Sequence, residues 1–357
     1  MSTAGGTLWG LGPLQPVLDV PGVTDVLVNG GELVPGGHRV WLDRGRGLEA
    51  TVVPLGGERE VRSLAVRLAS AAGRRLDESL PWVDARLPGG VRLHAVVPPV
   101  TPSGTHLSLR LLRAARVDLP TLVTTGTLPA AWARVLEALV RRGAAFLVTG
   151  GTGAGKTTLL SALLGLVPPT ERIVLVEDVG ELRPAHPHVV RLEARHANVE
   201  GRGAITLEDL VRQALRMRPD RLVVGECRGA EVRELLAALN TGHAGGCGTL
   251  HANSPAEVPA RLEALAGLAG LDAAAVHRQA AAAFDAIVHV ERTAAGRRVT
   301  EVATVATEAA PGGDRRLAVR CALGPEGPGP GWPRLATRLG LPDEAVRTAA
   351  VARPEGP

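Results

Sequence analysis

The chain has 357 residues, 45% of them hydrophobic but only 2% aromatic, and its 40 basic and 36 acidic residues give a net charge of +4. This length suits two domains with aliphatic cores, while the mild basic excess and the lack of tyrosine disfavour a nucleic-acid-binding function. Three cysteines without ligand spacing disfavour a disulfide framework and a zinc site, and without an 18-residue apolar stretch or a leader pattern we expect a cytoplasmic protein that meets membranes only peripherally.

Residues 13–112 are predicted to form a smaller N-terminal α/β domain. Apolar residues at helical spacing predict a helix at 58–72. Alternating apolar and polar residues predict strands at 25–29, 38–43, 91–97 and 106–111. Proline and glycine punctuate residues 113–129, which predicts a linker.

Residues 130–306 alternate between amphipathic and short apolar segments, a pattern typical of parallel α/β units. A helix over 206–217 begins at a Thr206–Asp209 capping box. Buried strands are predicted at 144–149, 173–176 and 222–224. Residues 307–357 are rich in glycine and proline and are predicted to be weakly ordered, with a short amphipathic helix at 332–341 left open.

A phosphate-binding loop lies between a predicted strand and a predicted helix. Its residues match G-x-x-x-x-G-K-[ST] and are Gly150, Gly151, Thr152, Gly153, Ala154, Gly155, Lys156 and Thr157, with Thr158 opening the helix. In such a loop backbone N–H groups surround the phosphates, the lysine reaches the β and γ phosphates, and Thr157 ligates Mg²⁺. Lys156 is the only lysine in the chain, which indicates that a compact ammonium is needed where a planar guanidinium would not fit. The sequence therefore predicts ATP and Mg²⁺ binding.

Two later strands are predicted to end in carboxylates, at the sheet edge where ligands of parallel α/β proteins collect. We assign Glu226 as the carboxylate that activates water, and Glu177 as the residue that positions Mg²⁺ or water. His243 and His251 flank a glycine-rich turn. Each histidine is a candidate phosphate contact, with an ordinary loop histidine as the alternative.

A family resemblance emerges from the order of these motifs. Within residues 146–260, the P-loop is followed by Val176 to Leu182, by Val224 to Gly229, and by the two histidines. These segments resemble the Walker A motif, Asp box, Walker B motif and His box of the ATPases of type II and type IV secretion systems. Shorter N-terminal segments at 28–30, 73–79, 84–87 and 92–99 look most similar to the tight-adherence (Tad) pilus branch, which includes conjugal-transfer ATPases.

The resemblance implies a homo-hexameric motor in which a PAS-like N-terminal domain closes over a RecA-like ATPase domain and acts on inner-membrane platform proteins. It also implies that N-terminal arginines reach the γ phosphate, and Arg92 and Arg110 match them by position, while Arg228 joins the site from the Walker B segment. Small residues between His243 and His251 depart from the family pattern, in which polar residues are common.

Two other readings of the P-loop remain open. The first is a P-loop kinase or a nucleic-acid translocase, although no lid or acceptor pocket is evident and a translocase would be stimulated by DNA or RNA. The second is a subunit that binds ATP without hydrolysing it. The two carboxylates, Glu177 and Glu226, favour hydrolysis over the second alternative.

Overall fold

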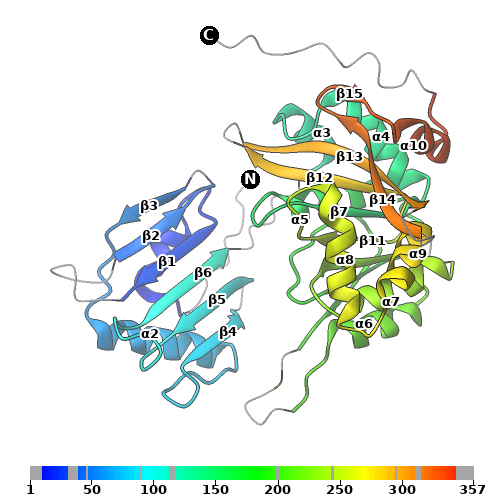
Figure 1. The fold of residues 1–357 in the computed structure, drawn as a ribbon. Helices are drawn as coiled ribbons and strands as arrows, with labels where there is room; N and C mark the ends of the chain where they lie inside the picture. The colour runs from blue at the N-terminus through cyan, green and yellow to red at the C-terminus, as the bar shows by residue number, and fades with distance from the viewer. Residues whose placement is uncertain are drawn as a thin grey trace. The chain divides into compact units, whose positions relative to one another are not determined.

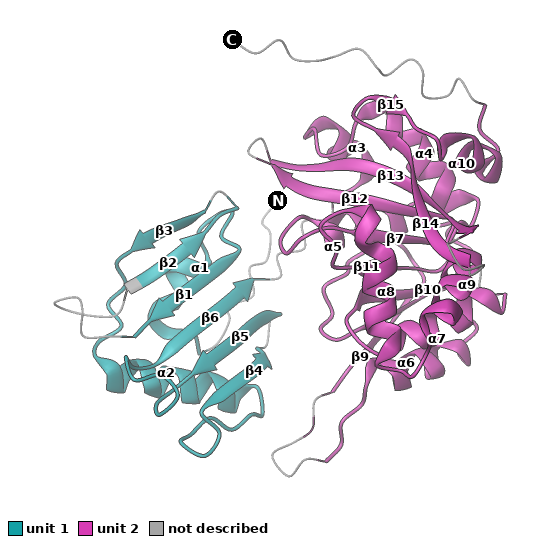
Figure 2. Ribbon diagram, in the orientation of Figure 1, with its two compact units in different colours: residues 1–113 teal, residues 114–357 magenta. Residues whose placement is uncertain are grey.

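The chain forms two compact units, residues 1–113 and 114–357 (Figures 1 and 2). The structure is a computed structural model that describes residues 10–30, 39–45, 47–87, 90–111, 117–195, 197, 202–242, 245–293, 296–309 and 315–342. Among these residues, no helix is long and apolar enough to cross a membrane.

Unit 1 is an antiparallel sheet packed against a helix. Its strands run in the order β3-β2-β1-β6-β5-β4. Helix α2 (Glu58–Ala71) buries Val61, Leu64 and Leu68 in the same cluster as the inward residues of the strands. The strands are β1 (Asp25–Asn29), β2 (Arg39–Asp43), β3 (Leu48–Thr51), β4 (Trp82–Arg86), β5 (Val91–Val96) and β6 (His106–Leu111), preceded by η1 (Gly12–Leu14) and α1 (Gln15–Leu18). The predicted α/β character is confirmed, but strands β3 and β4 were missed.

Unit 2 is built on a mixed sheet whose described strands follow the order β15-β14-β13-β12-β7-β11-β10-β8-β9. The six strands from β12 to β9 run parallel, and β13, β14 and β15 add antiparallel pairs at one edge. Their bounds are β7 (Phe146–Thr149), β8 (Ile173–Glu177), β9 (Val189–Glu193), β10 (Arg221–Cys227), β11 (Cys247–Leu250), β12 (Ala286–Thr293), β13 (Gly296–Ala309), β14 (Arg315–Gly324) and β15 (Gly327–Pro328).

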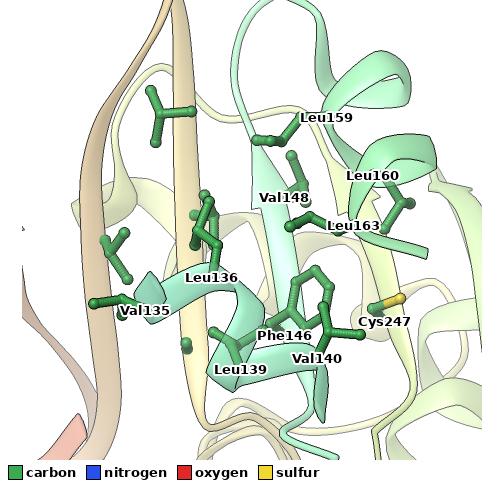
Figure 3. Close-up of a cluster of buried hydrophobic side chains, with 14 of the residues drawn as sticks. Val135, Leu136, Leu139, Val140, Phe146, Val148, Leu159, Leu160, Leu163 and Cys247 are labelled. Carbon is green, nitrogen blue, oxygen red and sulfur yellow. The ribbon is translucent and has the colours of Figure 1, made fainter. Parts of the chain in front are cut away.

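Helices cover both faces of this sheet (Figure 1). They are α3 (Leu119–Thr124), α4 (Ala130–Arg141), α5 (Lys156–Leu164), α6 (Leu207–Leu215), α7 (Glu231–Asn240), η2 (Pro255–Glu257), α8 (Val258–Gly267), α9 (Ala273–Ala283) and α10 (Trp332–Leu339). Along β7, Phe146 and Val148 belong to the buried hydrophobic cluster that includes side chains of α3, α4, α5 and α10. Leu147, which points to the other face, belongs to the cluster that includes side chains of α6 to α9. Figure 3 shows Phe146 and Val148 among side chains of α4 and α5. Strands covered on both faces explain the short apolar runs in the sequence.

The predicted fold class, a RecA-like P-loop domain with a smaller N-terminal α/β domain, is confirmed. Strand β11 lies between β7, which leads into the P-loop, and β10, which ends near Glu226. The predicted capping box is also present, because Asp209 N donates to Thr206 Oγ1 at 3.1 Å and Thr206 N donates to Asp209 Oδ2 at 3.2 Å.

The predicted linker at 113–129 is wrong for its described part, residues 117–129. Helix α3 lies there, and Leu119, Leu122 and Leu128 are buried in the core of unit 2. Pro120 occupies one of the first positions of α3, where its missing N–H costs no hydrogen bond, so this proline supports a helix rather than a linker.

The predicted weak order of residues 307–357 is wrong for residues 315–342, while 310–314 and 343–357 lie outside the described residues. Strand β14 pairs along β13, and the option of a helix at 332–341 is confirmed by α10. Gly331 serves close packing, because a Cβ there would lie 2.5 Å from the carbonyl oxygen of Arg320.

A buried arginine fills the base of β10, at the edge opposite the P-loop. Arg221 is 5% exposed, and its Nε donates to Glu171 Oε2 at 2.6 Å. The guanidinium lies against Gly143, and it would collide with any Cβ placed on Gly245. This arginine therefore takes up the space beside the turn that precedes β11.

Candidate functional site

The P-loop connects β7 to α5 and depends on glycine for its shape. Gly150, Gly153 and Gly155 have φ angles of +152°, +71° and +105°, which residues with a side chain rarely adopt. A Cβ on Gly150 would also collide with the carbonyl oxygen of Val290 on β12. Gly151, Thr152 and Gly153 are exposed, so this part of the loop is accessible to a ligand.

Lys156 lies inside the loop, where it is 7% exposed. Its Nζ donates to the carbonyl oxygens of Gly150 and Gly151 at 3.0 and 2.9 Å, and it lies 3.4 Å from both ring nitrogens of His251. Burial lowers the pKa of the ammonium, and the carboxylate of Glu226 opposes this shift. The ammonium is therefore held by weakly basic carbonyls that phosphate oxygens can replace.

Glu177 ends β8 and is 3% exposed. Its Oε1 accepts hydrogen bonds from the backbone N–H groups of Glu181 and Leu182, both at 2.8 Å. The other oxygen, Oε2, is buried and has no hydrogen-bond partner among the residues that the structure describes, and burial raises the pKa of the carboxyl. Gly225 on β10 makes room for this side chain, because a Cβ there would lie 2.7 Å from Glu177 Cγ. The unpartnered oxygen is suited to a metal ion or an ordered water.

Glu181 is a site residue that the sequence analysis missed. Thr157 Oγ1 donates to Glu181 Oε2 at 3.4 Å, so a carboxylate lies beside the hydroxyl that P-loop proteins use for Mg²⁺. The signal was present in the sequence, because Glu181 follows Glu177 by four residues, but it lies in a loop after the strand and not at the strand's end.

The carboxylate of Glu226 lies between the side chains of His251 and Arg228. Its Oε1 lies 2.5 Å from His251 Nε2, and its Oε2 forms an ion pair with Arg228. The imidazole and the guanidinium therefore contact one carboxylate oxygen each. Burial lowers the pKa of His251, as does the Lys156 ammonium. The structure thus brings four predicted residues together: Lys156, Glu226, Arg228 and His251.

Three other predicted residues lie in unit 1 or outside the described residues. Arg92 and Arg110 are cross-strand partners on β5 and β6 of unit 1. Arg92 pairs with Asp84 at 3.7 Å, and Arg110 Nε donates to Asp25 Oδ1 at 2.9 Å. Their contact with a nucleotide stays a prediction. His243 lies outside the described residues.

The donor set of the site fits Mg²⁺ that arrives with phosphates. No group of three or more His, Cys, Asp or Glu side chains able to hold a metal is found among the described residues. Magnesium usually binds through one or two protein oxygens plus substrate phosphates and waters, rather than in an all-protein cage. Thr157 with Glu181, and the buried Oε2 of Glu177, satisfy that requirement.

A RecA-like sheet with a P-loop after β7, and acids at the ends of β8 and β10, defines a P-loop nucleotide-binding protein. The comparison with known families narrows this class. A family model described as type II/IV secretion system protein matches residues 23–310, so the chain belongs to that family. The resemblance inferred from the motifs is thereby confirmed.

Individual relatives agree with this membership. The chain is 57% identical over 305 residues to a putative conjugal transfer protein of Mycobacterium tuberculosis strain H37Rv, covering 84% of this chain and 85% of that protein. It is 32% identical over 292 residues to the conjugal transfer protein TrbB of Rhizobium radiobacter, covering 80% and 84%. The crystal structure of the pilus retraction motor PilT with bound ADP matches with a TM-score of 0.55 at 24% identity, covering 89% of this chain and 83% of that one, which shows a shared fold.

Proposed function

We propose that this protein is an ATPase that hydrolyses ATP to ADP and phosphate and thereby drives a type II/IV-like secretion or pilus-assembly system. The observation that carries the proposal is the contact of Lys156 and Glu226 with the same histidine, His251, beside an open P-loop. In support of the proposal, the Lys156 ammonium and the Glu226 carboxylate both lie at the carboxyl edge of one sheet, where ligands of parallel α/β proteins collect.

The reaction is an in-line attack of water on the γ phosphate. Glu226 accepts a hydrogen bond from the attacking water and orients it, while Lys156 leaves the carbonyls of Gly150 and Gly151 to bind phosphate oxygens. His251 and Arg228 hold the carboxylate of Glu226 in place. Thr157, Glu181 and Glu177 would hold Mg²⁺, which when bound neutralises charge that develops on the phosphates.

The finer parts of the proposal rest on the family and on the names of the relatives. We assign the protein to the Tad-pilus or conjugal-transfer branch, as a homo-hexamer on the cytoplasmic face of the inner membrane, where it contacts platform proteins. ATP turnover moves the smaller unit relative to the motor unit, and Arg92 and Arg110 supply positive charge to the γ phosphate. The names of the relatives in Mycobacterium tuberculosis and Rhizobium radiobacter support the conjugal-transfer part of this assignment.

Phosphate release by the purified full chain tests the proposal. We expect Glu226→Gln to bind Mg-ATP as the unchanged protein does and to hydrolyse it about a hundred-fold more slowly, because the amide cannot take up a proton from water. Glu137→Gln on α4, which removes an exposed partner of Arg141, is the matched control and should leave turnover unchanged. Full activity of Glu226→Gln would overturn its role.

The alternatives predict other results in the same assay. Stimulation of turnover by DNA or RNA would favour a translocase, and phosphate transfer to an acceptor other than water would favour a kinase. Mg-ATP binding with no phosphate release would favour a subunit that binds nucleotide without turnover.

A further inference from the structure

The β12–β13 hairpin lies against the P-loop at several points that the proposed mechanism does not use. At the loop entrance, Thr149 Oγ1 and the buried His289 Nδ1 are 2.8 Å apart, and the Val290 carbonyl oxygen packs against Gly150. Beyond the hairpin turn, Arg297 returns to the same loop from β13. The hairpin therefore contacts the P-loop both at its first residue, Gly150, and at Gly153.

Arg297 contacts the P-loop at Gly153 and Gly155. Its Nε donates to the carbonyl oxygen of Gly153 at 3.0 Å. Its side-chain stem crosses Gly155, because a Cβ on this glycine would lie 3.0 Å from Arg297 Cδ. Gly155 is thus glycine for two reasons, its φ of +105° and the arginine stem above it.

The bond from Arg297 fixes the orientation of the peptide group between Gly153 and Ala154, whose N–H can bind a phosphate oxygen. The carbonyl of Gly153 and the N–H of Ala154 belong to one planar peptide group and point in opposite directions. With the carbonyl held by Arg297, the Ala154 N–H is directed across the loop and donates to Gly151 O at 3.3 Å. Gly151 O also accepts from Lys156 Nζ, so this N–H and the ammonium share one carbonyl, which both would leave to bind phosphate oxygens.

We propose that Arg297 is a positioning residue for the phosphates of ATP: its bond to Gly153 O presets the P-loop so that the Ala154 N–H faces the ligand. This inference rests on the proposed function, since it names how the same site binds nucleotide. Arg297 acts through the loop and contributes to the binding of ATP and ADP alike. The charge-assisted bond also polarises the peptide, which strengthens its N–H as a donor.

The neighbouring Arg298 offers a matched control. Successive residues of a strand point to opposite faces, so Arg298 points away from the loop that Arg297 contacts. It is exposed like Arg297 and lies opposite Glu291 in the β12–β13 pairing. Removing either arginine changes the charge of the chain equally.

The test is calorimetric titration of the full chain with Mg-ATP and Mg-ADP, together with steady-state phosphate release. We expect Arg297→Ala to raise Kd for both nucleotides and KM for ATP by about ten-fold, with kcat within about two-fold of the unchanged protein. Arg297→Lys, which keeps a cationic donor on a flexible stem, should recover most of the affinity. Arg298→Ala should bind as the unchanged protein does.

The outcomes separate this inference from the proposed function. Unchanged Kd in Arg297→Ala, or an equal loss in Arg298→Ala, would overturn the positioning role while leaving the ATPase proposal intact. A large fall in kcat with unchanged Kd would also overturn it, since the arginine would then act on the transition state. Failure of the unchanged protein to bind either nucleotide would refute the proposed function itself.

Discussion

Lys156 is the only lysine in the chain, and its ammonium rests on two carbonyls of the loop that it would leave to bind phosphate. We expect Lys156→Ala to weaken Mg-ATP binding by at least about a hundred-fold, because the charge-assisted bonds to the phosphates are lost. Lys156→Arg should fail as well, since a planar guanidinium needs more width than the buried cradle offers. Calorimetric titration measures both, and tight binding by Lys156→Arg would show that the cradle is wider than we infer.

Glu177 gives a second prediction at this scale, in which pH is the variable. Burial raises the pKa of its carboxyl, so the ionised form costs stability above that raised pKa, and the cost disappears as the pH falls and the folded state takes up the proton. We therefore expect Glu177→Gln to be at least as stable as the unchanged protein at pH 8, with the difference shrinking toward pH 4, while phosphate release falls about a hundred-fold.

Thermal unfolding at a series of pH values measures this difference for Glu177→Gln, without nucleotide or Mg²⁺. A variant that is less stable than the unchanged protein at pH 8 would show that the two backbone bonds to Oε1 outweigh the burial of the charge.

The sequence predicted the individual residues of the site better than their pairing. Glu177 and Glu226 could be found because parallel strands end at a common edge. The contact of Glu226 with His251 joins the ends of β10 and β11, and periodicity carries no information on such a contact. Glu181 was missed because its place beside Thr157 depends on the path of a loop.

At the scale of elements, α10 shows where composition misled the prediction. Leu335 is fully buried in the cluster that contains α4 and β7, although its segment follows a stretch rich in glycine and proline. We expect Leu335→Ala to lower the free energy of unfolding by about 2–5 kcal/mol, the usual cost of a cavity in a packed core. Chemical denaturation measures this loss. The exposed neighbour Arg334→Ala should change stability by less than about 0.5 kcal/mol, and equal effects would mean that α10 is not docked.

The elements that were predicted well are those whose pattern is local. Strand β8 and helix α6 follow directly from apolar spacing and caps. The antiparallel extension by β14 and β15 could not be found this way, because a glycine after it packs against the backbone of β14, as Gly331 does against Arg320. Composition alone does not distinguish such contacts from disorder.

At the scale of the whole molecule, the proposal predicts assembly. With a non-hydrolysable ATP analogue, we expect a particle of six times the 37.0 kDa chain mass in light-scattering measurements.

Arg110→Ala should still bind nucleotide but hydrolyse it at least about ten-fold more slowly, since a cation at the γ phosphate is lost. A monomer under all conditions would contradict the hexamer, and full activity of Arg110→Ala would contradict the arginine's role.

The guanidinium of Arg221 explains the glycine at position 245, in the turn before β11. Because it occupies the room that a side chain at Gly245 would need, these two positions cannot change independently. A homologue with a smaller residue in place of Arg221 would have space for a larger side chain at Gly245, and one that keeps the arginine and its partner Glu171 must keep the glycine. The glycine at position 245 is thus tied to the ion pair between Arg221 and Glu171.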